Sequence, residues 1–178
     1  FTFACDENLL RSLDVSKNPD LYSVNVRNNY MDFATLPWPG NWFEYYHAQH
    51  EMELNDTYKV GDVIDLSHRV LRQGTTTNGV LFRVPKEDPT KPVELDNTYY
   101  TYENGKVTLL KALSDQVFLQ FTNTVLKDYP IRTENFNIRT AEDFGKDIKA
   151  VELTSLGTAG APVKMSVGVI GATQTSPV

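Results

Sequence analysis

Leu10-Arg11-Ser12-Leu13-Asp14-Val15-Ser16-Lys17-Asn18 is the stretch on which our interpretation of the fold rests, and it has the pattern L-x-x-L-x-L-x-x-N. The stretches on either side repeat the pattern: Phe3-Ala4-Cys5-Asp6-Glu7-Asn8, which lacks the leading leucine, and Leu21-Tyr22-Ser23-Val24-Asn25-Val26-Arg27-Asn28-Asn29. Steps of 10 and then 11 residues hold at three positions: Phe3, Leu13 and Val24; Cys5, Val15 and Val26; Asn8, Asn18 and Asn29. This agreement indicates an internal repeat.

The pattern is that of leucine-rich repeats, in which L-x-L forms a short strand whose alternate side chains point into a solenoid. The asparagine turns the chain, and its amide is expected to bond to backbone groups of neighbouring turns. Cys5 is then a small buried residue, not a reactive thiol or a lipid attachment site. A weaker fourth round covers residues 31–36.

The solenoid is expected to close at Leu36-Pro37-Trp38-Pro39-Gly40. Proline cannot donate to a further strand, and Trp38 is large enough to cover the last apolar turn. If two rounds make one coil, the repeats are too few to bury their own faces. We therefore expect that the chain is a fragment of a longer protein, or that the repeats lean on the domain that follows.

Composition excludes some classes of function. The 178 residues carry a net charge of -6, so no basic surface for nucleic acid is expected. No run of 18 apolar residues occurs, which predicts that no segment spans a membrane. Cys5 is the only cysteine, so the chain cannot form an intramolecular disulfide.

Residues 41–140 change to short strand-like runs separated by turns, as in an antiparallel β-sandwich. Asn104-Gly105, between two runs rich in β-formers, predicts a hairpin. Residues 141–146 are interpreted as a polar linker, and strands are expected at 148–153 and 163–171. The three expected units are a repeat end with its cap at 1–40, a sandwich at 41–140, and a tail at 141–178. The tail either begins a further β module or adds edge strands to the sandwich.

Leu13-Asp14-Val15-Ser16-Lys17-Asn18-Pro19 and the cysteine-bearing round before it resemble the bacterial BspA-like leucine-rich-repeat cell-surface proteins. That family alternates rounds of the types L-D-C-S-x-N and L-D-V-S-K-N. In the first round of this chain, Ala4 replaces the aspartate and Asp6-Glu7 replaces the Ser-x pair. In the third round, Val26-Arg27 departs from the family pattern. Val63-Ile64-Asp65-Leu66-Ser67 and the Asn104-Gly105-Lys106 turn resemble the immunoglobulin-like module that follows such repeats. The resemblance implies a mainly β chain with the end of a leucine-rich-repeat solenoid and an immunoglobulin-like sandwich. It also implies a non-enzymatic role at the cell surface, in adhesion and protein binding.

Candidate binding residues are those that alternation directs outward from the repeats: Arg11, Asp14, Ser16, Tyr22, Asn25 and Arg27. Trp42 and Tyr45 are added from an aromatic cluster that also contains Trp38, Phe43 and Tyr46. That cluster has two interpretations, a packed joint between repeats and sandwich or an exposed platform for protein or sugar.

No cofactor or metal is predicted. Alternation places His47 and His50 on opposite faces of a strand, and no EF-hand loop pattern occurs. No nucleophile–base set or phosphate-binding loop is visible. The leading hypothesis is an extracellular protein-binding and adhesion module. The alternatives are a carbohydrate-binding module of a surface glycan-utilisation system, so that the partner is a protein or a glycan, and an enzyme of undefined class.

Overall fold

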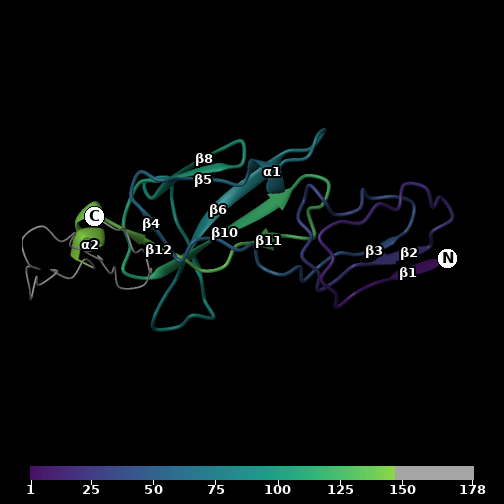
Figure 1. Cartoon of the computed structure of the whole chain (residues 1–178), viewed down its shortest axis with the longest axis horizontal. Helices are drawn as coiled ribbons and strands as arrows, with labels where there is room; N and C mark the ends of the chain where they lie inside the picture. The colour runs from purple at the N-terminus through teal and green to yellow at the C-terminus, as the bar shows by residue number, and fades with distance from the viewer. Residues whose placement is uncertain (147–178) are drawn as a thin grey trace, which may run out of the picture.

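A computed structural model describes residues 1–146 of the chain, and these residues form a mainly β protein. Figure 1 shows an elongated molecule with a small three-stranded sheet near the N-terminus and longer antiparallel strands beyond it. The tail strands expected at 148–153 and 163–171 lie outside the described residues.

The N-terminal sheet consists of β1 (Thr2–Ala4), β2 (Ser23–Asn25) and β3 (Phe43–Tyr45), which pair in parallel in chain order. Phe3 pairs with Val24, and Val24 pairs with Glu44. Each advance of 20 or 21 residues therefore returns the chain beside its previous strand.

Two of the expected strands are absent. Residues 13–15 and 31–36 form no strand, because a step of 10 or 11 residues carries the chain away from the sheet, where no neighbour completes a ladder. The closure expected at residues 36–40 is also corrected, because β3 follows it and extends the same sheet. The domain boundary expected at residue 40 therefore falls between β2 and β3, which are neighbouring strands of one sheet.

A left-handed backbone conformation recurs after each strand of the N-terminal sheet. Three non-glycine residues, each three positions beyond a strand, have positive φ: Glu7 (56°), Asn28 (52°) and Ala48 (57°). Such residues are uncommon, so three at spacings of 21 and 20 mark one recurring turn.

The side chain that follows each left-handed turn residue bonds to nearby backbone. Asn29 is fully buried; its Nδ2 donates to the Cys5 carbonyl at 2.9 Å, and its Oδ1 accepts from the Leu10 N–H at 2.9 Å. Twenty residues later, Gln49 Nε2 donates to the Val26 carbonyl at 2.8 Å and its Oε1 accepts from the Met31 N–H at 3.1 Å. The expected bond from an asparagine to a neighbouring turn is confirmed for Asn29.

The remaining elements are β4 (Thr57–Lys59), β5 (Val63–Asp65), α1 (Ser67–Val70), β6 (Thr77–Val84), β7 (Val93–Glu94), β8 (Tyr100–Glu103), β9 (Lys106–Leu109), β10 (Gln116–Asn123), β11 (Ile131–Arg132), β12 (Asn137–Arg139) and α2 (Ala141–Lys146). One antiparallel sheet has the order β11-β10-β6-β7 and another β5-β9-β8, while β4 and β12 pair in parallel. Tyr102 of β8 lies over Phe121 of β10, with ring centroids 6.1 Å apart. The arrangement is compatible with a β-sandwich.

The predicted hairpin is confirmed, since β8 and β9 pair antiparallel around Asn104 (φ 48°) and Gly105 (φ 78°). A β-carbon on Gly105 would lie 2.5 Å from the Ser67 Cα, so this turn also requires glycine for space. Residues 141–146, expected to be a linker, form α2 because the Thr140 hydroxyl accepts the Asp143 N–H at 3.2 Å as a helix cap.

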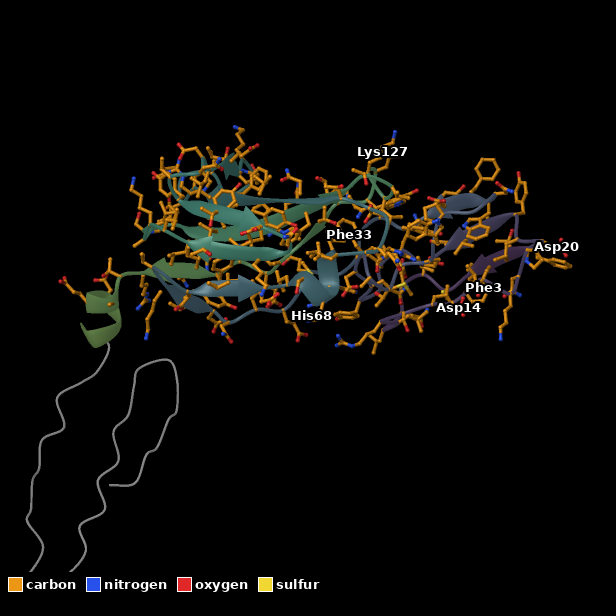
Figure 2. The ribbon with its side chains drawn as sticks, turned by 90° about the horizontal axis from the view of Figure 1, so that it is seen from above. Phe3, Asp14, Asp20, Phe33, His68 and Lys127 are labelled. Carbon is orange, nitrogen blue, oxygen red and sulfur yellow. The ribbon has the colours of Figure 1, made fainter. Side chains whose placement is uncertain are left out.

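The two parts share one hydrophobic core. Phe33, fully buried, lies where they meet (Figure 2). Arg69, from α1, pairs with the buried Asp32 carboxylate at 3.0 Å, and its carbonyl accepts the Ala34 N–H at 3.1 Å. The Tyr129 hydroxyl, on the β10–β11 loop, donates to the Glu44 carbonyl of β3 at 3.1 Å. The N-terminal sheet therefore packs against the antiparallel part of the chain.

Candidate functional site

Three aromatic side chains are exposed at β2 and β3, and we call Tyr22, Phe43 and Tyr45 the aromatic face. They are 64%, 58% and 44% exposed. Phe43 and Tyr45 are two residues apart on one strand and therefore project from the same side of the sheet. Tyr22 contacts the Phe43 ring edge-on, with centroids 5.2 Å apart. Large apolar rings gathered in this way are typical of binding surfaces.

The opposite side of β3 belongs to the joint. Trp42 Nε1 donates to the Tyr46 hydroxyl at 3.1 Å, and the Tyr46 ring lies 5.2 Å from that of Tyr129. Burial raises the pKa of Tyr46 to about 12. Burial and the neighbouring Asp128 carboxylate also raise the pKa of Glu44. Each interpretation of the aromatic cluster therefore applies to part of it: Trp42 and Tyr46 pack in the joint, whereas Phe43 and Tyr45 are exposed.

A groove of about 490 Å³ lies between residues 12–16 and the start of the joint. We call it the tryptophan groove, because Trp38 and Trp42 both line it, together with Asp14, Ser16 and Arg72. Trp38 is 45% exposed and does not cover the last apolar turn as expected. Its ring instead lies 4.5 Å from the Arg72 guanidinium carbon, a favourable cation–π distance.

The other predicted residues lie apart from this groove. Arg11 is exposed, with its guanidinium carbon 5.3 Å from the Tyr30 ring centre. Arg27 is half-buried, pairs with Asp6 at 3.7 Å, and donates its N–H to Asn25 Oδ1 at 3.3 Å. The structure thus brings Asp14, Ser16 and Trp42 together, places Tyr22 and Tyr45 on the aromatic face, and leaves Arg11, Asn25 and Arg27 outside both sites.

Phe43, Trp38 and Arg72 are among the residues of the two sites that the predicted set did not contain. Phe43 alternates with Tyr45, so strand periodicity was sufficient to find it. Trp38 was named as part of the expected cap and of the aromatic cluster, but not as a candidate binding residue. Arg72 lies 34 positions further along the chain and had no local pattern to mark it.

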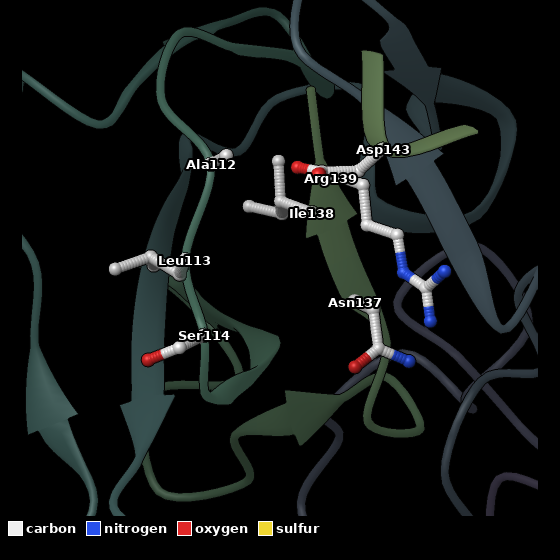
Figure 3. A pocket seen from close by; sticks show the side chains of 7 residues that line it. All are labelled: Ala112, Leu113, Ser114, Asn137, Ile138, Arg139 and Asp143. Atoms are coloured by element: carbon white, nitrogen blue, oxygen red, sulfur yellow. The ribbon is translucent and has the colours of Figure 1, made fainter. Parts of the chain in front are cut away.

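A further hollow of about 520 Å³ lies beside β12. Figure 3 shows Leu113 and Ser114 on one side of it and Asn137 and Arg139 on the other, with side chains that do not converge. The Leu113 N–H donates to the Ile138 carbonyl at 3.1 Å, so backbone pairing already joins the two walls. This hollow lacks a convergent set of reactive groups.

Within residues 1–146, no group of three His, Cys, Asp or Glu side chains is placed to hold a metal ion. His50 instead stacks on Tyr30, with ring centroids 4.2 Å apart. In the same part of the chain no helix has the length and apolar character needed to cross a membrane. No family model matches the chain, and neither the curated proteins nor the solved structures contain a match.

Proposed function

We propose that this chain is a non-enzymatic, cell-surface protein-binding module that contacts an extracellular partner through its aromatic face. The observation that carries the proposal is the exposure of Tyr22, Phe43 and Tyr45 on one small sheet. Aromatic residues are enriched among the few residues that dominate binding at protein interfaces.

We further propose that the N-terminal part is the end of a leucine-rich-repeat solenoid. The advance of 20–21 residues per parallel strand supports this, because it matches the length of such repeats. The recurrent left-handed turn at Glu7, Asn28 and Ala48 supports it too. In this architecture the exposed faces of stacked strands form an extended binding surface.

The antiparallel part is proposed to be immunoglobulin-like. Its long central strands β6 and β10 pair along their full length, and β5, β9 and β8 form the second sheet. Two such antiparallel sheets with seven or more strands are the general plan of immunoglobulin-like domains. The BspA-like resemblance rests mainly on the repeat sequence Leu13-Asp14-Val15-Ser16-Lys17-Asn18-Pro19, and the proposed extracellular location is what that resemblance implies.

The test is binding of the whole 178-residue chain to an array of purified extracellular-matrix and serum proteins, measured by surface plasmon resonance. The test variant carries Phe43→Ser and Tyr45→Ser. The control carries Val63→Ser and Leu110→Ser, which are 54% and 43% exposed at or beside the β5-β9-β8 sheet.

We expect selective binding to at least one protein, weakened roughly thirtyfold or more in the test variant, because loss of an interface hot spot costs about 2 kcal/mol or more. The control should bind within about twofold of the unsubstituted chain, since substitutions outside an interface have little effect. Absence of selective protein binding, or equal loss in both variants, would contradict the proposal.

A further inference from the structure

The tryptophan groove combines aromatic surface with charges of both signs. Its volume of about 490 Å³ falls within the range of roughly 300–1,000 Å³ typical of small-molecule sites. Trp38 contributes a partly exposed ring, and Ser12, Ser16 and Thr35 are among the polar residues that line the walls. The groove therefore has both an apolar platform and polar partners for a small ligand.

The negative charge is supplied by Asp14. Bonds from the Ser16 hydroxyl and the Ser16 N–H hold the pKa of this carboxyl below its usual range. The Ser16 N–H lies 2.9 Å from Asp14 Oδ1, which fixes the carboxylate at the groove wall. Asp14 is thus an ionised, positioned hydrogen-bond acceptor.

The positive charge is supplied by Arg72. Its Nη1 donates to the Phe33 carbonyl at 3.1 Å and to the Leu36 carbonyl at 2.5 Å, so the side chain is held by the backbone of the joint. Among residues 1–146 no carboxylate pairs with this guanidinium. A guanidinium has five N–H donors, and the two backbone bonds use only Nη1. Donors therefore remain for a ligand.

We propose that the tryptophan groove binds a neutral saccharide, with a sugar ring packed on the exposed part of Trp38 that Arg72 leaves open and its hydroxyls bonded to Asp14 and Arg72. The C–H-rich face of a sugar suits the electron-rich face of an aromatic ring. Hydroxyls both donate and accept, so one ligand satisfies the carboxylate and the guanidinium together. A uronic acid can pair with Arg72 but brings a second carboxylate beside Asp14, and an amino sugar can pair with Asp14 but brings a second cation beside Arg72. A neutral sugar bonds to both groups without this repulsion, so we expect it to be preferred. This site is separate from the aromatic face.

Trp38 and Trp42 are the only tryptophans in the sequence, and both line the groove. Intrinsic fluorescence of the whole chain therefore reports its occupancy directly. The neutral probes are cellotriose, maltotriose and mannotriose. The charged probes are tri-galacturonate and chitosan trimer, and triglycine tests whether a zwitterion fits the two charges instead.

Saturable fluorescence change with at least one neutral trisaccharide, and at least tenfold weaker response to every charged probe, is the expected result. Isothermal titration calorimetry then compares variants that leave the joint intact. Trp38→Ala should abolish detectable binding. Asp14→Asn should weaken it about tenfold, since a hydrogen bond to a charged group is stronger than one to a neutral group.

Phe43→Ala, which removes an exposed ring outside the groove, is the matched control and should leave the saccharide affinity within about twofold. This control also separates the two proposals, because it damages the aromatic face and spares the groove. No response to any neutral probe, stronger binding of a charged probe or triglycine, or full affinity in Trp38→Ala would overturn the inference.

Discussion

Replacement of Asn29 by alanine should destabilise the chain far more than the same replacement at Asn18, although both occupy the same position of the sequence repeat. Asn29 is fully buried and bonds to backbone groups of two successive turns. Asn18 is exposed, and its side chain makes no hydrogen bond among the described residues. The comparison isolates the tertiary contribution because the side chain and its substitute are identical.

The magnitude follows from the bonds. Asn29 Nδ2 lies within 3.1 Å of the carbonyls of Cys5, Val26 and Arg27, which share its two protons, and Oδ1 accepts the Leu10 N–H. Three bonds of about 1 kcal/mol each are lost, and the polar groups left behind are only partly rehydrated. We expect Asn29→Ala to cost about 2–4 kcal/mol, and Asn18→Ala to change stability by less than about 0.5 kcal/mol.

The assay is equilibrium unfolding in urea, followed by tryptophan fluorescence and by circular dichroism. Trp42 contacts the joint through Tyr46, so its emission reports loss of the packed sheet. Equal destabilisation by the two substitutions, or a loss under about 0.5 kcal/mol for Asn29→Ala, would refute the claim that the buried bonds hold the successive turns together.

Two further predictions concern a turn and the joint. Gly105→Ala should lower the free energy of unfolding in urea by about 2 kcal/mol more than Gly74→Ala. Both glycines have positive φ (78° and 76°), but only at Gly105 does the new β-carbon meet backbone, 2.5 Å from the Ser67 Cα. Equal losses of stability would contradict this steric argument. Raised pH should destabilise the chain through Tyr46, because the pKa of this side chain is about 12 in the folded state and about 10 in the unfolded state. The stability that the neutral Tyr46 side chain contributes is therefore present below pH 10 and is lost as the pH rises towards 12. In thermal melts from pH 9 to 11.5 the Tyr46→Phe variant should lose less stability than the unsubstituted chain, and identical slopes would contradict this assignment.

Several features follow from local pattern. The Asn104-Gly105 pair predicted the hairpin because both residues tolerate the positive φ that a tight turn needs. The strand-like runs expected within residues 41–140 include β10 (Gln116–Asn123), which pairs with β6 and β11 in the larger sheet. The sequence analysis did not predict α2, because its only visible start signal is the capping hydroxyl of Thr140 and the segment around it is polar.

The sequence pattern recurs every 10 or 11 residues, whereas the parallel strands pair at 21 and 20 residues. Val24 lies in β2, but Leu13 and Val15 lie outside any strand. Asn29 and Asn18 differ for the same reason. Apolar spacing identified the buried Val15, Val24 and Val26, but Phe3, expected to point inward, is 39% exposed. Strand pairing depends on which backbone segment returns alongside another.

The sequence by itself was enough to predict a mainly β chain, the burial of Val15, Val24 and Val26, and the hairpin turn. These features depend on residues a few positions apart. Only the tertiary structure decided which aromatic rings are exposed. Tyr46 packs against the distant Tyr129, whereas Phe43 and Tyr45 on the other face of β3 have no such cover among residues 1–146. Likewise, the tertiary structure alone placed Arg72 beside Trp38. Burial depends on what packs against a face, and that neighbour is far away in the chain.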